Sequence, residues 1–213
     1  MFIIFDTETT GFPSTKVAST HPSQARVVQL AAVVLDENFK EISSLCEYIK
    51  PSGWSISEGA YKAHGISMDT CEEKGKPISE VLEKFFLMAL PCSYMVCHNT
   101  RFDVTMLNIE FDNTWPPCAE VAPVAHWLNN VGTMCTMSAA TPVCKLPFAT
   151  RKNAKVDKQE ARFKFPKLEE AYKHFFDEEL TGAHDALVDV RATARLFEAL
   201  CKGRHFASIY SRS

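Results

Sequence analysis

The sequence predicts an α/β fold in which helices flank a single mixed sheet. Three apolar, strand-like segments come first and are joined by short turns, which is typical of an antiparallel meander. Segments with helical spacing of apolar residues then alternate with short strand-like runs. A meander followed by such alternation predicts parallel strands added to the same sheet, with helices packed against it.

The three segments of the meander are each recognised by their side chains. Residues 2–5 are a continuous apolar run, and residues 26–35 are apolar and rich in β-branched side chains. The turn-forming residues 36–38 connect them to a partner strand over 41–49. Pro51 and the residues after it end the meander.

Helices and short strands are expected in the rest of the chain. Residues 77–90 carry apolar side chains at helical spacing and are bounded by Pro77 and Pro91, and Asp185 is a suitable N-cap for a helix over 186–201. The full expectation is helices over 57–63, 77–90, 99–111, 124–128, 166–176 and 186–201, and strands over 94–97 and 133–136. Residues 138–165 are expected to be irregular and mobile.

The composition is that of an ordinary globular protein. The 213 residues are sufficient for one domain, which we expect over 1–213, with a core at 1–201 and a tail at 202–213. No apolar stretch reaches the length of a membrane span, and no signal peptide is recognisable, so we expect a soluble, cytoplasmic protein. The eight cysteines form no Cys-x-x-Cys pair, which argues against zinc and against a disulfide framework.

The charge of the chain is unevenly distributed. The net charge is −3, but residues 145–173 hold nine Lys or Arg against four acids, a local net charge of +5. This basic stretch has two interpretations of equal weight. It is either a solvated loop or an electrostatic contact surface for phosphates.

Two carboxylates follow the first strand directly. Asp6 and Glu8 are two residues apart, so on an extended chain both side chains lie on the same face. A solvated strand end is the ordinary explanation for such a pair. Because this strand is apolar and leads into a turn, we instead expect a hard divalent cation between the two carboxylates.

Two further acids stand at predicted helix starts. Asp103 follows the strand at 94–97, and Asp189 lies at the start of the last helix, just after His184. A carboxylate is favourable near any helix N-terminus, which is a sufficient explanation for each acid alone. Four such acids and one histidine together favour a catalytic centre.

Three motifs occur in an order that resembles a known enzyme family. They are Phe5-Asp6-Thr7-Glu8-Thr9-Thr10-Gly11, His98-Asn99-x-x-Phe102-Asp103 and His184-Asp185-Ala186-Leu187-x-Asp189, with a weaker fourth at His64-Gly65-Ile66. The pattern resembles the DEDDh 3′–5′ exonucleases, the DnaQ-like family that includes polymerase proofreading subunits. The resemblance runs from Phe2 to Leu200 and implies a ribonuclease-H-like fold.

The resemblance implies a role for each ionisable residue. Asp6, Glu8, Asp103 and Asp189 would bind two divalent cations, Mg²⁺ or Mn²⁺. His184, whose unperturbed pKa of about 6.5 suits proton abstraction near neutrality, would be the general base for the attacking water. The products would be nucleoside 5′-monophosphates released from a 3′ end.

Other residues would bind the 3′-terminal nucleotide. The backbone of Thr9, Thr10 and Gly11 would approach it, with Phe12 as an apolar wedge beside its base; an ordinary core position is the alternative for Phe12. Asn99 would donate to the nucleotide backbone, and Phe102 would stack below it or simply pack. His64 and Ile66 would belong to a turn on the substrate side, unless His64 is a plain surface residue. His98 is assigned a structural role, and residues 12–25 form a longer loop than compact bacterial members need.

The motifs specify the chemistry more closely than the substrate. Single-stranded nucleic acid is the expected partner, DNA rather than RNA, and an exoribonuclease is the alternative because no residue identifies a reader of the 2′-hydroxyl. A non-catalytic binding module on the same fold is a second alternative, which the complete five-residue set disfavours. A polymerase or another repair protein could be a partner, and the oligomeric state is open.

Overall fold

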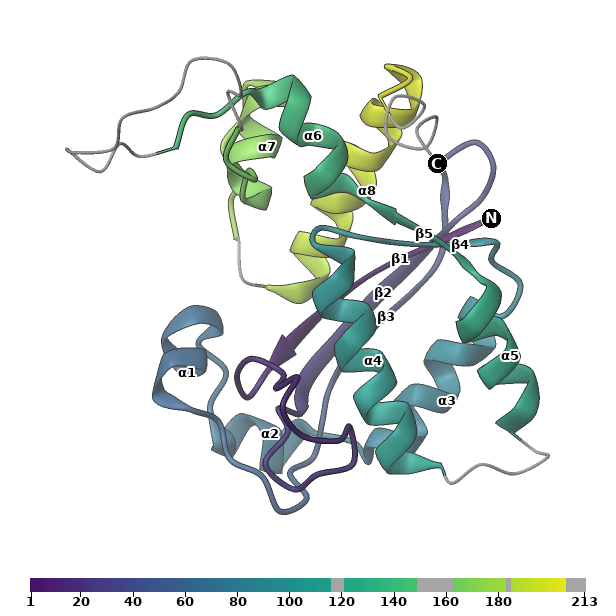
Figure 1. Ribbon diagram of the computed structural model, residues 1–213, viewed down its shortest axis with the longest axis vertical. Helices are drawn as coiled ribbons and strands as arrows, with labels where there is room; N and C mark the ends of the chain where they lie inside the picture. Colours follow the sequence, from purple (N-terminus) through teal and green to yellow (C-terminus); the bar gives the residue numbers. More distant parts are fainter. Residues whose placement is uncertain (116–120, 149–162, 183–184, 206–213) are drawn as a thin grey trace.

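Five strands form one sheet in the order β3-β2-β1-β4-β5. The structure is a computed structural model that describes residues 1–115, 121–148, 163–182 and 185–205 (Figure 1). The strands are β1 (Phe2–Thr9), β2 (Val27–Leu35), β3 (Glu41–Tyr48), β4 (Tyr94–Cys97) and β5 (Gly132–Cys135). The first three pair antiparallel, whereas β4 pairs parallel with both β1 and β5. The predicted mixed sheet is therefore confirmed.

Eight helices are assigned in the described part of the chain. They are α1 (Glu58–His64), α2 (Met68–Lys74), α3 (Ile78–Ala89), α4 (Thr100–Thr114), α5 (Ala122–Asn130), α6 (Thr136–Cys144), α7 (Leu168–Phe176) and α8 (Ala186–Lys202). None of the helices described is both long enough and apolar enough to cross a bilayer.

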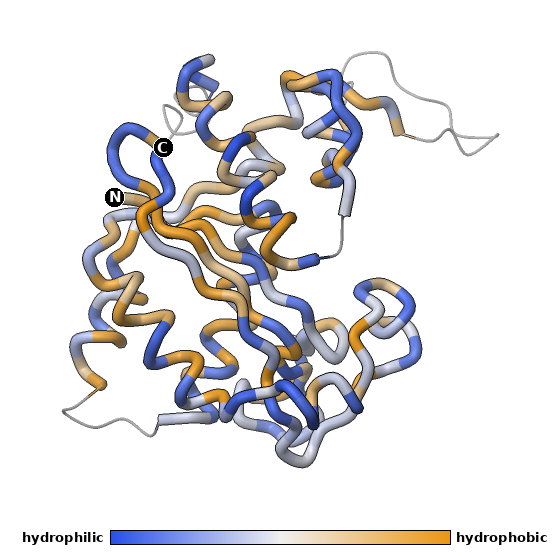
Figure 2. The backbone as a smooth tube through the Cα atoms, turned by 180° about the vertical axis from the view of Figure 1, so that it is seen from behind, coloured by the Kyte–Doolittle hydropathy of each residue, from blue (hydrophilic) through white to orange (hydrophobic). Residues whose placement is uncertain are grey.

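Helices cover both faces of the sheet. One core cluster joins Ile3 and Phe5 of β1 to Phe85 of α3 and Met106 of α4. The other joins Ile4 to side chains of α6, α7 and α8, including Phe197. Figure 1 shows these two helical groups on opposite sides of the strands, and Figure 2 shows the strands as strongly hydrophobic segments between them. All nine residues of β2 are buried, as expected for a strand covered on both faces.

Two of the helices differ from the expectation. The short helix α2 was not predicted; its N-cap Ser67 accepts a hydrogen bond from the backbone N–H of Thr70. Residues 138–144, expected to be irregular, lie in α6, because Ala139, Ala140 and Cys144 pack into the core cluster below α8. The rest of the expected irregular stretch falls largely on residues 149–162, outside the described residues.

The alternation along β1 decides what each side chain can reach. Ile3, Phe5 and Thr7 face α3 and α4, whereas Ile4 and, by the same alternation, Asp6 and Glu8 face α8. β1 runs beyond Phe5, so both carboxylates lie on the strand itself rather than after it. The C-terminal half of the central strand therefore presents Asp6 and Glu8 to one layer of helices and Thr7 to the other.

Candidate active site

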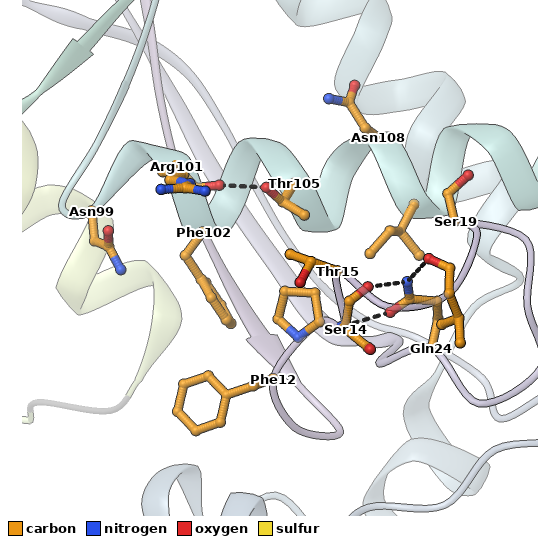
Figure 3. A pocket seen from close by; sticks show the side chains of 13 residues that line it. Phe12, Ser14, Thr15, Ser19, Gln24, Asn99, Arg101, Phe102, Thr105 and Asn108 are labelled. Carbon is orange, nitrogen blue, oxygen red and sulfur yellow. Dashed lines mark hydrogen bonds between the residues drawn. The ribbon is translucent and has the colours of Figure 1, made fainter.

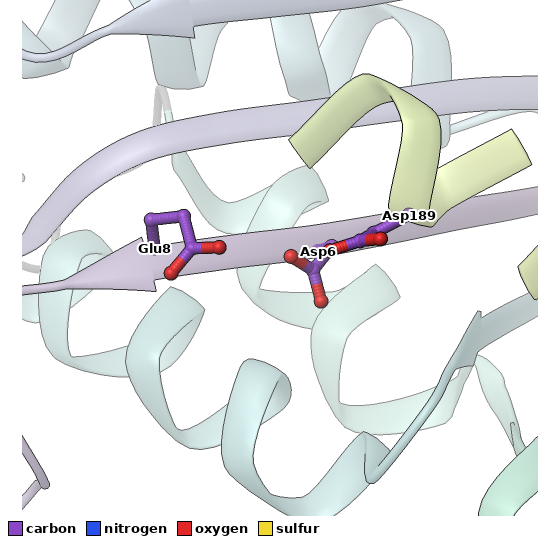
Figure 4. Close-up of side chains that lie close together, drawn as sticks. All are labelled: Asp6, Glu8 and Asp189. Atoms are coloured by element: carbon purple, nitrogen blue, oxygen red, sulfur yellow. The ribbon is translucent and has the colours of Figure 1, made fainter. Parts of the chain in front are cut away.

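Three carboxylates converge at the C-terminal half of β1. Asp6 and Glu8 come from the strand and Asp189 from the first turn of α8, and each offers an oxygen within 4.8 Å of the other two (Figure 4). Asp6 and Glu8 therefore share a face of the strand, as the sequence predicted. All three side chains are partly buried.

Asp103 approaches the same place from the opposite face of the sheet. It lies in the first turn of α4, is 2% exposed and stands outside the group of three. Its Oδ1 accepts hydrogen bonds from the backbone N–H of Thr7 at 3.0 Å and from the Thr7 hydroxyl at 2.8 Å. Thr7 lies between Asp6 and Glu8, and its two hydrogen bonds hold Asp103 beside the strand, where its charge acts on Asp6.

Burial and neighbouring acidic groups raise the pKa values of Asp6, Glu8 and Asp103. Burial, followed by the charges of Asp103, Glu8 and Asp189, raises the pKa of Asp6 well above its usual range. Burial and the charge of Asp189 raise the pKa of Glu8 to about 7. Burial likewise raises the pKa of Asp103 to about 7, although the two hydrogen bonds from Thr7 oppose this shift. These shifts mean that the cluster resists carrying its full negative charge.

The donor set fits a hard divalent cation. The three converging groups are all carboxylates, and oxygen ligands are those that Mg²⁺ and Mn²⁺ prefer. A cation between them would offset the repulsion that raises the pKa values of Asp6 and Glu8. Asp6, Glu8 and Asp189 can therefore hold such an ion, and Asp103 lies close enough for its charge to act on Asp6.

The start of α8 is held by a side-chain cap. Asp185 accepts hydrogen bonds from the backbone N–H groups of Leu187 at 3.0 Å and Val188 at 3.2 Å. This cap fixes the first turn, which carries Asp189 toward β1. His184, the expected general base, precedes Asp185 in the chain but lies outside the described residues.

A cavity of about 410 Å³ opens beside Glu8. Thr7, Glu8, Thr9, Gly11 and Phe12 line it from the first motif, and Phe102 and His64 line it from α4 and α1. We call it the terminal cavity. Thr10 lies outside its lining, where its hydroxyl accepts from the N–H of Arg26 at 2.9 Å.

Two aromatic rings, those of Phe12 and Phe102, line the terminal cavity, and the amide of Asn99 lies outside its lining. The side chain of Phe12 is 90% exposed, so a core position is excluded. Its ring packs edge-on against that of Phe102, with the centroids 6.0 Å apart. Asn99, just before α4, has a φ of 82°, a left-handed conformation that asparagine tolerates better than most residues. Its side chain lies on the far side of Phe102 in Figure 3 and does not line the terminal cavity.

Two of the histidines have structural contacts. His64 is 8% exposed, so the alternative of a surface residue was wrong: its Nδ1 accepts from the N–H of Ile66 at 3.0 Å and its Nε2 lies 3.3 Å from the Thr9 carbonyl. These bonds tie α1 and the turn at Ile66, itself 7% exposed, to the end of β1. His98 lies 3.0 Å from both the Thr136 hydroxyl and the Pro166 carbonyl.

The structure adds residues to the terminal cavity that the sequence did not suggest. Ser57, Gly59, Ala60 and Ala63 line it from α1. Glycine and alanine carry no chemical group that a motif could reveal. The only signal was Ser57, which caps α1 by accepting from the N–H of Ala60 at 3.2 Å.

Comparison with known proteins identifies the class of enzyme that this fold and site define. A family model described as Exonuclease (RNase_T) matches residues 3–197, almost the whole described fold. The chain therefore belongs to this exonuclease family: it is a nuclease of the DnaQ-like DEDD group in the ribonuclease-H-like superfamily.

Individual relatives agree with this assignment. The chain is 26% identical to DNA polymerase III subunit epsilon of Buchnera aphidicola subsp. Acyrthosiphon pisum over 95% of this chain and 73% of that protein. Among solved structures, E. coli exonuclease I in a zinc-bound complex with single-stranded DNA gives a TM-score of 0.71 at 24% identity over 99% of this chain. The complex of exonuclease I with a dA16 oligonucleotide gives 0.70 at 23%. This likeness establishes the fold, and the chain spans only about 43% of the exonuclease I chain.

Proposed function

We propose that this chain is a metal-dependent 3′–5′ exonuclease that removes nucleoside 5′-monophosphates from single-stranded DNA. The observation that carries the proposal is the convergence of Asp6, Glu8 and Asp189 at the edge of the terminal cavity, to which Glu8 itself belongs. A cavity that can receive the end of a nucleic-acid strand, with carboxylates beside one wall, suits cleavage of one nucleotide at a time. DNA is favoured because the relatives named above are a DNA polymerase subunit and a nuclease crystallised with DNA.

The acids would hold the divalent cations. Asp6, Glu8 and Asp189 provide the converging oxygens, and Asp103 adds its charge from behind the strand. When bound, Mg²⁺ or Mn²⁺ would supply charge stabilisation for the phosphate and a lowered pKa for water. Thr7, by holding Asp103 with two hydrogen bonds, would set how closely that fourth carboxylate approaches.

His184 would take the proton from the attacking water. It stands directly before Asp185, whose side chain caps the helix that delivers Asp189. A base with a pKa near neutrality in that place suits proton abstraction, which typically contributes about 10²–10⁴-fold to a rate.

The terminal cavity would hold the last nucleoside. Phe12 and Phe102 provide aromatic surface for its base, which favours any base alike, and the backbone of Gly11 lets the sugar approach closely. His64 would form the opposite wall together with the small side chains of α1, and Ile66, which lies outside the lining, would hold His64 in place through its N–H.

A trimming assay with His184→Ala tests the proposal. End-labelled single-stranded DNA, RNA and mismatched duplex are incubated with Mg²⁺, Mn²⁺ or a chelator. We expect stepwise loss from the 3′ end of DNA only with a cation, and a fall in kcat of about 10²–10⁴-fold in the variant. The fold, followed by circular dichroism, and Mn²⁺ binding should persist in His184→Ala, whereas Asp189→Asn should weaken Mn²⁺ binding.

The control is His126→Ala, which removes an exposed histidine of α5. It should trim like the unaltered protein. Equal turnover by His184→Ala would overturn the general-base role, and cation-independent trimming would overturn the metal dependence. Preferential trimming of RNA would replace DNA as the substrate. Co-elution with a replicative DNA polymerase core, which the polymerase relative suggests, would identify a partner.

A further inference from the structure

Two free cysteines lie side by side on β4 and β5. Cys97 is the last residue of β4 and Cys135 the last residue of β5, and the parallel register of the two strands pairs them directly. Residues paired in this way point to the same face of a sheet, because side chains alternate along both strands. Cys97 belongs to the core cluster of α3 and α4, so this shared face is the one that α4 covers.

The pairing brings the two thiols within reach of a disulfide bond. Neighbouring strands lie about 4.7–4.9 Å apart, and the Cα atoms of disulfide-bonded cysteines are usually about 4.4–6.8 Å apart. The remaining approach of the two side chains falls at the end of β5, where the strand changes directly into α6. Cys135 can therefore turn toward Cys97 without a change in the pairing of β4 and β5 before it.

Cys97 also lies close to the acidic cluster. It is 0% exposed, and burial, followed by the charges of Asp103, Asp6 and Cys135, raises its pKa well above the usual range. The carboxylates and the second cysteine thus act on the same buried thiol. A bond between the two cysteines would form directly beside the residues proposed to hold the cations.

Cys135 is accessible from outside, whereas Cys97 is not. A cavity of about 810 Å³ opens at Cys135, between Asn99 and Arg101 at the start of α4 and Ser138 in the first turn of α6. Cys135 is partly exposed and lines this cavity, but Cys97 is outside its lining. A small molecule that enters the cavity therefore meets Cys135 first.

The surroundings of Cys135 favour its thiolate. Seven cysteines are found among the residues that the structure describes, and Cys135 alone of these has a lowered pKa. Burial acts against the thiolate, but hydrogen bonds with the side chain and backbone of Ser138 and with the backbone of Thr100 and Asn99 outweigh it. Burial raises the pKa of the other six: Cys46, Cys71, Cys92, Cys97, Cys144 and Cys201.

These features together are those of a redox-active pair. Oxidation-sensitive cysteines are accessible, have thiolate character and stand next to a second cysteine that can resolve the oxidised form. Cys135 has the first two properties, and Cys97 provides the third. A reversible bond of this kind differs from the permanent disulfide framework that the cysteine spacing argues against.

We propose that Cys135 is a redox modification site, at which a hydroperoxide oxidises the thiol and Cys97 then closes a reversible disulfide between β4 and β5 that slows the enzyme. The sulfur of Cys135 attacks one peroxide oxygen, the O–O bond breaks, and a sulfenic acid and one water form. The sulfur of Cys97 then attacks the sulfenic sulfur, the S–O bond breaks, and the hydroxide leaves with the thiol proton as a second water. Two thiols are oxidised and one hydrogen peroxide is reduced.

The disulfide would disturb the start of α4. Cys135 hydrogen-bonds with the backbone of Asn99 and Thr100, and the turn that follows carries Phe102 and Asp103. A sulfur bonded to Cys97 no longer makes these contacts in the same way. Displacement of about 1 Å at a catalytic site can reduce a rate by about 10²-fold. This effect on trimming rests on the proposed function, whereas the modification itself does not.

Mass spectrometry after peroxide treatment tests the modification. The full chain with Mg²⁺ is exposed to hydrogen peroxide and dimedone, which traps sulfenic acids, and is then unfolded in N-ethylmaleimide and digested. We expect a Cys97–Cys135 disulfide in the unaltered protein, which dithiothreitol removes. Cys97→Ala cannot close the disulfide, so we expect dimedone on Cys135 in this variant. Circular dichroism verifies that each variant is folded.

The matched control is Cys46→Ser, which removes a more exposed thiol on β3 whose pKa is raised. This variant should form the same disulfide as the unaltered protein. Dimedone on Cys46 in preference to Cys135 would show that exposure alone decides the reaction and would overturn the inference. Dimedone on Cys135 of the unaltered protein, without a disulfide to Cys97, would overturn the pair.

Trimming of end-labelled single-stranded DNA, measured before and after peroxide, tests the consequence. We expect peroxide to slow the unaltered protein and Cys46→Ser by up to about 10²-fold and dithiothreitol to restore both. Cys135→Ser should keep its own rate through the treatment. A disulfide that leaves the rate unchanged would overturn the inhibitory effect. A protein that forms the disulfide but trims no strand even before oxidation would overturn the proposed function alone, because the bond is mapped without an activity assay.

Discussion

Thr7 separates the roles of the acids on either side of it. It is 5% exposed and donates to Asp103 through both its N–H and its hydroxyl, while its neighbours Asp6 and Glu8 face α8. Side chains alternate between the two faces of a strand, so Thr7, a hydrogen-bond donor, points to one face and the acids on either side of it point to the other. Asp103 thus adds negative charge next to Asp6 without joining the three converging oxygens.

Removal of the Thr7 hydroxyl should raise the pKa of Asp103 further. The hydroxyl donates to the charged carboxylate and so lowers the pKa that burial has raised to about 7. In metal-free Thr7→Val we expect Asp103 to titrate at a higher pH than in the unaltered protein, as followed by carbon NMR of the carboxyl group. A lower or equal value would show that the hydroxyl does not stabilise the ionised form.

For individual residues, the sequence predicted the face to which a side chain points better than the contacts that the side chain makes. The shared face of Asp6 and Glu8 follows from strand periodicity alone, and the structure has it so. The turn of Asp103 toward Thr7 depends on how α4 docks on the sheet, which no local pattern encodes. The exposure of Phe12 and the burial of His64 likewise depend on the loop and on α1, so two alternatives stayed open for each.

The helix α4 connects the site to the loop that follows β1. Its first turn carries Phe102 and Asp103, and its last two turns carry Glu110, Asp112 and Asn113, which hold the loop. Glu110 is 1% exposed and accepts from Arg26 through both oxygens and from the N–H of Val27 at 2.7 Å. A single helix therefore positions a carboxylate of the site and holds the loop that follows β1.

Glu110→Ala should destabilise the fold strongly. It leaves the guanidinium of Arg26 and the N–H of Val27 without this acceptor in a largely buried place, and breaking such a pair typically costs about 3–5 kcal/mol. The free energy of unfolding in urea measures the loss. Glu198→Ala is the comparison, because its pair with Lys202 is a surface i,i+4 contact worth about 0.5 kcal/mol or less. Similar losses in the two variants would contradict a structural role for the buried pair.

Elements were predictable where the local signal was strong. The helix at α3 has proline at its start, and α8 has an N-cap and a long apolar stripe, so both were expected within a few residues of their observed bounds. The helix α6 carries Pro142 and no polar face that a periodic pattern would reveal, and it is stabilised mainly by burial of Ala139 and Ala140. Tertiary packing, rather than a local sequence pattern, therefore determines that α6 forms.

At the scale of the whole molecule, the acidic cluster lies at β1, the middle strand of the sheet. β1 has β2 on one side and β4 on the other, but β4 pairs with it only as far as Ile4, so where β1 carries Asp6 and Glu8 its backbone pairs with β2 alone. The pairing with β2 keeps Asp6 and Glu8 on the strand, with Asp189 close to both. Without a cation, the ionisation of the cluster opposes folding.

This opposition predicts how stability depends on pH and on divalent cations. The folded-state pKa values of Asp6, Glu8 and Asp103 are raised, those of Glu8 and Asp103 to about 7. The contribution of Glu8 and Asp103 to stability is therefore present below their unfolded pKa values near 4 and is lost as pH rises through about 7, and Asp6 acts in the same direction. A cation binds the ionised form and offsets the loss. We expect Mn²⁺ to raise the Tm above its value in chelator markedly at pH 8 and little at pH 5.

Thermal unfolding with Mn²⁺ or chelator at the two pH values provides the measurement. Asp6→Asn combined with Asp189→Asn removes two of the three converging carboxylates and should abolish most of the difference. A Mn²⁺ effect that is equal at both pH values, or that survives in the double variant, would locate the stabilising cation elsewhere.

The distance along the chain between Asp6 and Asp189 has a consequence for synthesis. One comes from the first strand and the other from α8, the last helix described, so a cation held between them closes a loop of nearly the whole chain. A growing polypeptide on the ribosome lacks Asp189 until the five strands and the first seven helices described have been made. The three carboxylates therefore come together only once the first strand and α8 are both folded.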